Sequence, residues 1–116
     1  MKVFIVEDNS LTRFTIKTAV EKLGHAAIGE AENFAEAVSK LRDSQADILL
    51  LDIILPDKSG LEVLKEFKKI NSRTKVIVVT ALEQDSLDEE LMKEGASFIL
   101  RKPFSVDELE KALNKI

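Results

Sequence analysis

The feature that most constrains the fold is a run of four apolar residues that leads directly into a carboxylate. Ile48 to Leu51 are all large and aliphatic, and Asp52 follows them immediately. A run this short and this uniformly apolar is typical of a strand buried on both faces, as in a parallel sheet covered by helices. Asp52 is then expected at the carboxyl end of that strand, the edge where open α/β sheets bind ligands.

Strand-like and helix-like segments alternate along the rest of the chain. Short apolar runs predict further strands at residues 3–6, 26–29, 76–79 and 98–100. The amphipathic segments between them predict helices, with cap-like pairs at Asn33–Glu36, Ser59–Glu62 and Ser105–Glu108. This alternation predicts an α/β fold: a doubly wound five-stranded parallel sheet of order 2-1-3-4-5, flavodoxin-like (βα)5.

The bulk properties narrow the class of protein. A chain of 116 residues fits one domain, so we expect a single domain over residues 1–116. The net charge of −4 gives no indication of a nucleic-acid or membrane surface. Without cysteine there is no disulfide, thiol catalysis or thiolate metal site. No signal peptide and no apolar run near ~18 residues are found, so we expect a cytoplasmic protein.

Polar residues follow the other predicted strands, and the predicted topology brings them to Asp52. Glu7 and Asp8 end the first strand, and the switch point between strands one and three lies beside them. Carboxylates this close raise one another's pKa unless a cation compensates, either a hard divalent cation or Lys102 after the fifth strand. Thr80 adds a hydroxyl, and the set suits Mg²⁺-assisted handling of a phosphoryl group with a carboxylate as nucleophile.

These residues carry a resemblance to a known family. The chain resembles the receiver domain of two-component response regulators from Val3 to Ile116, and in length most resembles the stand-alone chemotaxis type. The signature consists of four elements in order, each closing a predicted strand: Glu7-Asp8, Asp52 within Leu51–Pro56 and Gly60, Thr80-Ala81, and Lys102-Pro103.

The resemblance implies a role for each residue at the site. Asp52 would be the phosphoacceptor, taking its phosphoryl group from a sensor histidine kinase or a small phosphodonor. The chain would then be no enzyme beyond this autocatalytic acceptance and slow self-dephosphorylation. Mg²⁺ would be held by Glu7, Asp8, Asp52 and the backbone carbonyl of Ile54.

Three further residues complete the implied phosphoryl site. Lys102 would pair with a phosphoryl oxygen, Thr80 would move to hydrogen-bond the group, and the Ala81 amide would contact another oxygen. The Lys102–Pro103 peptide bond is expected to be cis.

The resemblance also implies how the signal leaves the domain. The surface of the fourth helix, fifth strand and fifth helix would change on phosphorylation and bind a downstream target protein. Since no output domain follows Ile116, we expect signalling by protein–protein contact, without direct nucleic-acid or membrane binding, from a monomer or weak dimer.

Some positions depart from the family pattern, and some polar residues are expected to have no role at the site. The switch position is usually aromatic but is Ile99 here, with Phe98 one place earlier, so a backbone shift or an aliphatic rotamer change is expected to replace a rotating ring. Apolar Ile54 and Leu82 are expected to hinder the attacking water and prolong the phosphorylated state. Residues expected in solvent, in loops or in helix caps are His25, Asp57, Lys58, Asp85 and Asp88.

Other classes of protein fit less well. A haloacid-dehalogenase-like phosphatase needs a second acid two residues after the nucleophile, where this chain has Ile54. A flavodoxin-like carrier or a dinucleotide fold needs a phosphate-binding loop after the first strand, where this chain has Glu7-Asp8, and the chain has no Trp or Tyr to flank a flavin. The strongest alternative is a receiver-like protein-interaction module that phosphorylation does not control.

Overall fold

Strands and helices alternate along the described residues, 1–71 and 73–116, of the computed structural model. The strands are β1 (Lys2–Val6), β2 (Ala26–Ala31), β3 (Ile48–Asp52), β4 (Lys75–Thr80) and β5 (Phe98–Arg101). The helices are α1 (Ser10–Lys22), α2 (Phe34–Leu41), α3 (Gly60–Ile70), α4 (Asp85–Lys93) and α5 (Val106–Asn114).

The strands form one parallel sheet in the predicted order, β2-β1-β3-β4-β5. Every residue of the central strand β3 is buried, as its apolar run requires. Val6 pairs with Leu51, and Asp52 pairs with Val79, so the carboxyl ends of β1, β3 and β4 lie level with one another. Side chains that leave these three strands therefore meet at one edge of the sheet.

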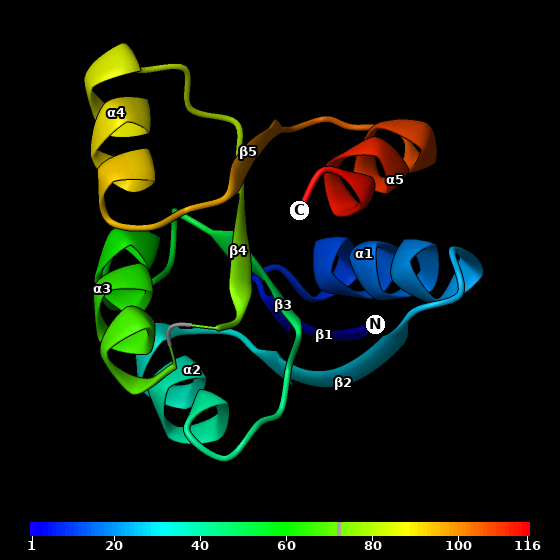
Figure 1. The fold of residues 1–116 in the computed structure, drawn as a ribbon, viewed down its shortest axis with the longest axis horizontal. Helices are drawn as coiled ribbons and strands as arrows, with labels where there is room; N and C mark the ends of the chain where they lie inside the picture. Colours follow the sequence, from blue (N-terminus) through cyan, green and yellow to red (C-terminus); the bar gives the residue numbers. More distant parts are fainter. Residues whose placement is uncertain (72) are drawn as a thin grey trace.

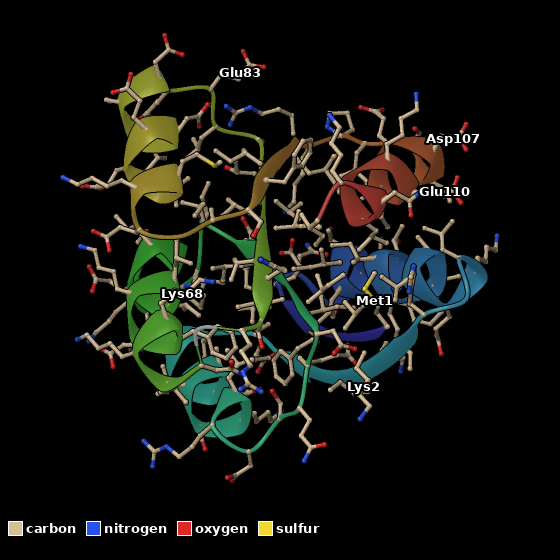
Figure 2. All side chains as sticks on the ribbon, viewed as in Figure 1. Met1, Lys2, Lys68, Glu83, Asp107 and Glu110 are labelled. Carbon is tan, nitrogen blue, oxygen red and sulfur yellow. The ribbon has the colours of Figure 1, made fainter. Side chains whose placement is uncertain are left out.

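Helices cover both faces of the sheet. Figure 1 shows α1 and α5 on one side of the strands and α2, α3 and α4 on the other. Successive strand residues alternate between these layers: Leu49 and Leu51 join the core beneath α2–α4, whereas Ile48 and Leu50 join the core beneath α1 and α5. Charged side chains such as Glu83, Asp107 and Glu110 lie at the outer surface (Figure 2).

The helix starts follow the predicted caps with one exception. Asn33 caps α2 through the Glu36 amide, and Ser105 and Glu108 form a reciprocal capping box on α5. The prediction of a box at Ser59 and Glu62 was wrong, because the Ser59 hydroxyl accepts from the Leu61 amide instead.

Strand β2 is longer than predicted. It extends past Gly29 to Ala31, because Glu30 and Ala31 pair with Ile5 and Val6 of β1. This pairing matters for the site, since it extends the hydrogen bonding between β1 and β2 to Val6, the residue before Glu7. Within the described ranges, none of the helices is both long and apolar enough to cross a bilayer.

Candidate functional site

Three carboxylates meet at the carboxyl edge of the sheet, as the topology predicted. Asp52 is the last residue of β3, and Glu7 and Asp8 directly follow β1. One oxygen from each carboxylate lies within 4.8 Å of the other two. Glu7 and Asp52 are buried, whereas Asp8 is exposed and opens the cluster to solvent. A small ligand can therefore reach the acids from the side of Asp8.

Lys102 reaches this cluster from the end of β5. Its Nζ atom donates to Glu7 Oε1 at 2.5 Å and to Asp52 Oδ2 at 3.2 Å. Burial alone lowers the pKa of Lys102, but its hydrogen bonds and charge interactions with Glu7 and Asp52 outweigh burial and raise the pKa above its usual value. The lysine is therefore a fixed positive charge between the acids. The Lys102–Pro103 bond is cis, as predicted.

The three carboxylates carry more negative charge than Lys102 compensates, and the pKa of Asp8 reflects this excess. Although Asp8 is exposed, the desolvation it does undergo raises its pKa, and a hydrogen bond and charge repulsion from Glu7 raise it further. One lysine does not neutralise three carboxylates. The donor set consists only of hard carboxylate oxygens, which is the chemistry that Mg²⁺ prefers, so the residues present fit this ion.

Backbone contacts fix the acids in place. Arg13 of α1 donates from Nη1 to the Glu7 carbonyl at 2.7 Å, and the Asn9 amide donates to Glu7 Oε2 at 3.0 Å. The Ile54 amide donates to Asp52 Oδ1 at 3.2 Å, which leaves Asp52 Oδ2 facing Lys102. The role of Arg13 was not predicted, because nothing in a helical pattern indicates which carbonyl a side chain reaches.

Gly60 is required by the close approach of α3 to the end of β3. A Cβ atom at this position would lie 2.2 Å from the Asp52 carbonyl oxygen and 2.8 Å from Ile53 Cα. The Gly60 amide also donates to the Ile53 carbonyl at 2.7 Å. The glycine therefore lets the loop after Asp52 fold back tightly on the strand.

Thr80 ends β4 beside these residues and is buried. Its hydroxyl oxygen accepts from the Leu82 amide at 3.0 Å, and its carbonyl accepts from the Lys102 amide at 2.9 Å. The following residue, Ala81, is exposed, as is Ile54 in the loop after Asp52. Ile99 lies within β5, paired with Val78, whereas the other sequence-predicted site residues lie at the carboxyl end of the sheet.

The two residues considered for the aromatic switch lie on opposite faces of β5. Ile99 packs against the core beneath α2–α4, whereas Phe98 packs against the other core, and Lys115 Nζ lies 5.0 Å from the Phe98 ring centroid. Strand periodicity separates them. Phe98 therefore cannot take the place of an aromatic residue at position 99.

The loop after Asp52 is hydrogen-bonded to the start of α2, a contact that was not predicted from the sequence. The Asp57 carboxylate accepts from the Phe34 and Ala35 amides at 2.8 and 3.1 Å and caps this helix. These backbone bonds, that from Phe34 first, lower the pKa of Asp57. Lys58 is exposed, as expected, and its Nζ atom lies 4.5 Å from the Phe34 ring centroid, a cation–π contact that the sequence did not predict.

Two expectations for charged residues need correction. Asp88 was expected in a loop or a cap, but it lies inside α4 and forms an ion pair with Arg101. His25 was expected in solvent, but it is half-buried and its Nδ1 lies 3.0 Å from the N-terminal amine, at the opposite end of β1 from the acids.

The fold and the cluster of three carboxylates define a doubly wound α/β protein with a candidate cation and phosphoryl site at its switch point. The family model of the response regulator receiver domain matches residues 3–114. The chain therefore belongs to the response regulator receiver domain family. It is 36% identical over 115 residues to the chemotaxis protein CheY of Thermotoga maritima, covering 99% of this chain and 96% of that protein. This match supports the predicted resemblance to the stand-alone chemotaxis type.

Solved structures show the same fold. A chain in the CheX–CheY–BeF3–Mg²⁺ complex from Borrelia burgdorferi matches with a TM-score of 0.90 and 26% identity, covering 99% of this chain and 85% of that one. The receiver domain of the sensor histidine kinase PA1611 from Pseudomonas aeruginosa, with a magnesium ion coordinated in its active-site cleft, matches with a TM-score of 0.87 and 25% identity. That match covers 98% of this chain and 94% of the other.

Proposed function

We propose that this protein is a phosphorylation switch in which Asp52 accepts a phosphoryl group. The observation that carries the proposal is the position of the Asp52 carboxylate, which is buried at the end of β3 with its Oδ2 atom 3.2 Å from Lys102 Nζ and its neighbours Glu7 and Asp8 beside it. A buried carboxylate held by one lysine, with further oxygen ligands next to it, suits nucleophilic attack on a phosphorus atom.

In the proposed reaction, one carboxylate oxygen of Asp52 attacks the phosphorus of a phosphohistidine on a sensor histidine kinase, or of a small phosphodonor. An O–P bond forms as the P–N bond of the phosphohistidine breaks, and the leaving imidazole keeps the electron pair and takes a proton from water. Lys102, with its raised pKa, stays charged and pairs with a phosphoryl oxygen. The Thr80 hydroxyl and the Ala81 amide donate to the other oxygens.

Glu7, Asp8, Asp52 and the Ile54 carbonyl would hold Mg²⁺ at this site. When bound, the ion neutralises negative charge on the phosphoryl oxygens and on the acids. The magnesium ion in the active-site cleft of the related Pseudomonas receiver domain supports this assignment. The chain's own contribution is to bury Glu7 and Asp52 and to leave Asp8 exposed at the entrance.

The signal would leave through the surface of α4, β5 and α5. Thr80 and Lys102 are joined by a backbone hydrogen bond between β4 and β5, so movement of either strand end is transmitted to the other. The CheX–CheY complex with BeF3 and Mg²⁺ from Borrelia supports regulation by a protein partner. The chain would act as an acceptor and relay, without turning over an external substrate.

Exposed Ile54 and half-buried Leu82 lie in the two loops that border the site. We infer that these apolar side chains hinder the water molecule that hydrolyses the acyl phosphate, so the phosphorylated state lasts long. A phosphoryl half-life of seconds near room temperature, measured with radiolabelled protein, would contradict this inference.

Incubation with acetyl phosphate and Mg²⁺, followed by intact-mass measurement, tests the proposal. We expect a mass gain of one phosphoryl group for the wild-type protein and none for Asp52→Asn. Asp43→Asn, an exposed loop residue after α2, is the matched control and should be phosphorylated normally. Absence of any gain in the wild-type protein would instead favour the interaction module that phosphorylation does not control.

A further inference from the structure

Arg101 connects β5 to the loop and helix that follow β4. It is the last residue of β5 and directly precedes Lys102 of the site. Its Nη1 atom donates to the Leu82 carbonyl in the β4–α4 loop, and its Nη2 atom pairs with Asp88 Oδ2 on α4. The guanidinium therefore binds two consecutive segments at once, in the forked geometry that arginine provides and lysine does not.

The ion pair is partly withdrawn from solvent. The Arg101 and Asp88 side chains are 34% and 26% exposed. The second oxygen of Asp88 is buried and has no hydrogen-bond partner among the described residues. Arg101 is thus the cation that compensates a half-buried carboxylate, and removing it would leave that charge unpaired on α4. A pair of this kind holds α4 in place more firmly than a fully exposed pair would.

Leu82 connects these contacts of Arg101 to Thr80. The Leu82 amide donates to the Thr80 hydroxyl oxygen at 3.0 Å, while the Leu82 carbonyl accepts from Arg101. The Lys102 amide then donates to the Thr80 carbonyl at 2.9 Å and closes a ring of hydrogen bonds between the ends of β4 and β5. Movement of Thr80 toward a phosphoryl group would therefore disturb its hydrogen bond with the Leu82 amide, and Arg101 binds the carbonyl of the same residue.

We propose that Arg101 is a positioning residue that, through Leu82 and Asp88, holds the Thr80 loop and α4 in the unphosphorylated arrangement. This inference rests on the proposed phosphorylation of Asp52. Arg101 provides a contact between β5 and α4 beside Ile99, the aliphatic residue at the switch position that is usually aromatic in the family. Breaking the Arg101–Asp88 pair shifts the equilibrium toward the arrangement in which Thr80 is free to engage a phosphoryl group.

The test is a beryllofluoride titration in the presence of Mg²⁺, followed by the amide NMR signals of Thr80 and Leu82. We expect Arg101→Met and Asp88→Asn each to tighten beryllofluoride binding by about fivefold, the lower end of typical coupling between sites. The double variant should be no tighter than either single variant, because the two residues act as one unit. The matched controls for charge are Lys93→Met and Glu89→Gln on the same helix, which should bind like the wild-type protein.

A merely structural role predicts a different pattern. Both variants would then be less stable in urea, and their beryllofluoride binding would be unchanged or weaker. Unchanged binding and weaker binding each overturn the proposal. Full additivity of the two substitutions in the double variant also overturns it. Asp88→Asn preserves the size of the side chain and serves if Arg101→Met does not fold.

Hydrogen exchange separates this proposal from the proposed function. Without any phosphoryl analogue, the Leu82 amide should exchange faster in Arg101→Met than in Lys93→Met, and equal rates would overturn the role of Arg101. If the wild-type protein itself does not bind beryllofluoride, the proposed function fails, while the exchange rates still decide whether Arg101 holds the loop.

Discussion

Lys102 Nζ lies 2.5 Å from Glu7 Oε1, although 95 positions separate the two residues in the chain. This contact joins the ends of β1 and β5, which are not neighbours in the sheet. It places a positive charge inside the cluster that would also bind a metal cation. The lysine therefore stabilises the acids in the metal-free protein and competes with a metal for them.

Replacing the lysine should have two effects of opposite sign. Without its charge, the three carboxylates are less well compensated, so we expect Lys102→Met to bind Mg²⁺ about fivefold more tightly in a calorimetric titration. The same variant should be phosphorylated by acetyl phosphate about 10²-fold more slowly, because a charged donor to the phosphoryl oxygens is gone. Lys22→Met, at the far end of α1, is the control. Weaker Mg²⁺ binding by Lys102→Met would contradict the competition.

Asp8 should oppose folding when it is ionised. Its pKa is raised above the usual value of 3.8, so this group favours the folded state most at low pH, and the contribution is lost as pH rises through 3.8 and the folded pKa. At neutral pH, Asp8→Asn should therefore stabilise the metal-free protein, by about 0.2–1 kcal/mol for an exposed charge interaction.

The same variant should lose most of the stabilisation that Mg²⁺ gives the wild-type protein. Urea denaturation with and without Mg²⁺ measures both effects. A lower midpoint for Asp8→Asn than for the wild-type protein in the absence of Mg²⁺ would disagree with the repulsion inferred here.

Asp57 should contribute stability that disappears in acid. Its folded pKa lies below 3.8, chiefly because the Phe34 amide donates to it, so the contribution is present above 3.8 and is lost as pH falls through the folded pKa. An NMR titration of the Asp57 side-chain carboxyl should give a midpoint below 3.8. Asp57→Ala should lower the urea midpoint at pH 7, whereas Asp43→Ala should not. An NMR titration midpoint at or above pH 3.8 for Asp57 would show that its cap on α2 is not formed in solution.

Gly60 should tolerate no side chain. A Cβ atom there would lie 2.2 Å from the Asp52 carbonyl oxygen, so Gly60→Ala must displace backbone next to the site. We expect a cost of about 1–3 kcal/mol and much slower phosphorylation by acetyl phosphate. Gly24→Ala is the control, since φ is +88° there and no atom lies within 4 Å of the added Cβ. It should cost about 1–2 kcal/mol for the left-handed conformation but leave phosphorylation unchanged.

The sequence was sufficient to predict the sheet order and the residues that gather at its carboxyl edge. Buried parallel strands are short apolar runs, and in this topology the residue that ends each run lies at the carboxyl edge of the sheet. This is why the sequence alone predicts that Asp52, Glu7, Thr80 and Lys102 lie close together. The capping box at Ser105 and Glu108 was predicted from the local pattern alone, although the same pattern at Ser59 and Glu62 forms no box.

Contacts between side chains on different elements were not predictable in this way. Asp57 caps a helix 22 to 23 positions earlier, and Arg101 pairs with Asp88 thirteen positions away across β5 and α4. Each depends on the direction in which a loop or a strand end turns, which strand and helix periodicity do not specify. Arg13 is a similar case, since its target is a backbone carbonyl.

The most direct test of the central claim is to locate the phosphoryl group chemically. After incubation with acetyl phosphate and Mg²⁺, borohydride reduces an aspartyl phosphate to homoserine, which tandem mass spectrometry of the peptides identifies by position. The account predicts homoserine at position 52 in the wild-type protein, and none when Mg²⁺ is removed by a chelator. Homoserine at another aspartate, or none in any peptide of the wild-type protein, would contradict it.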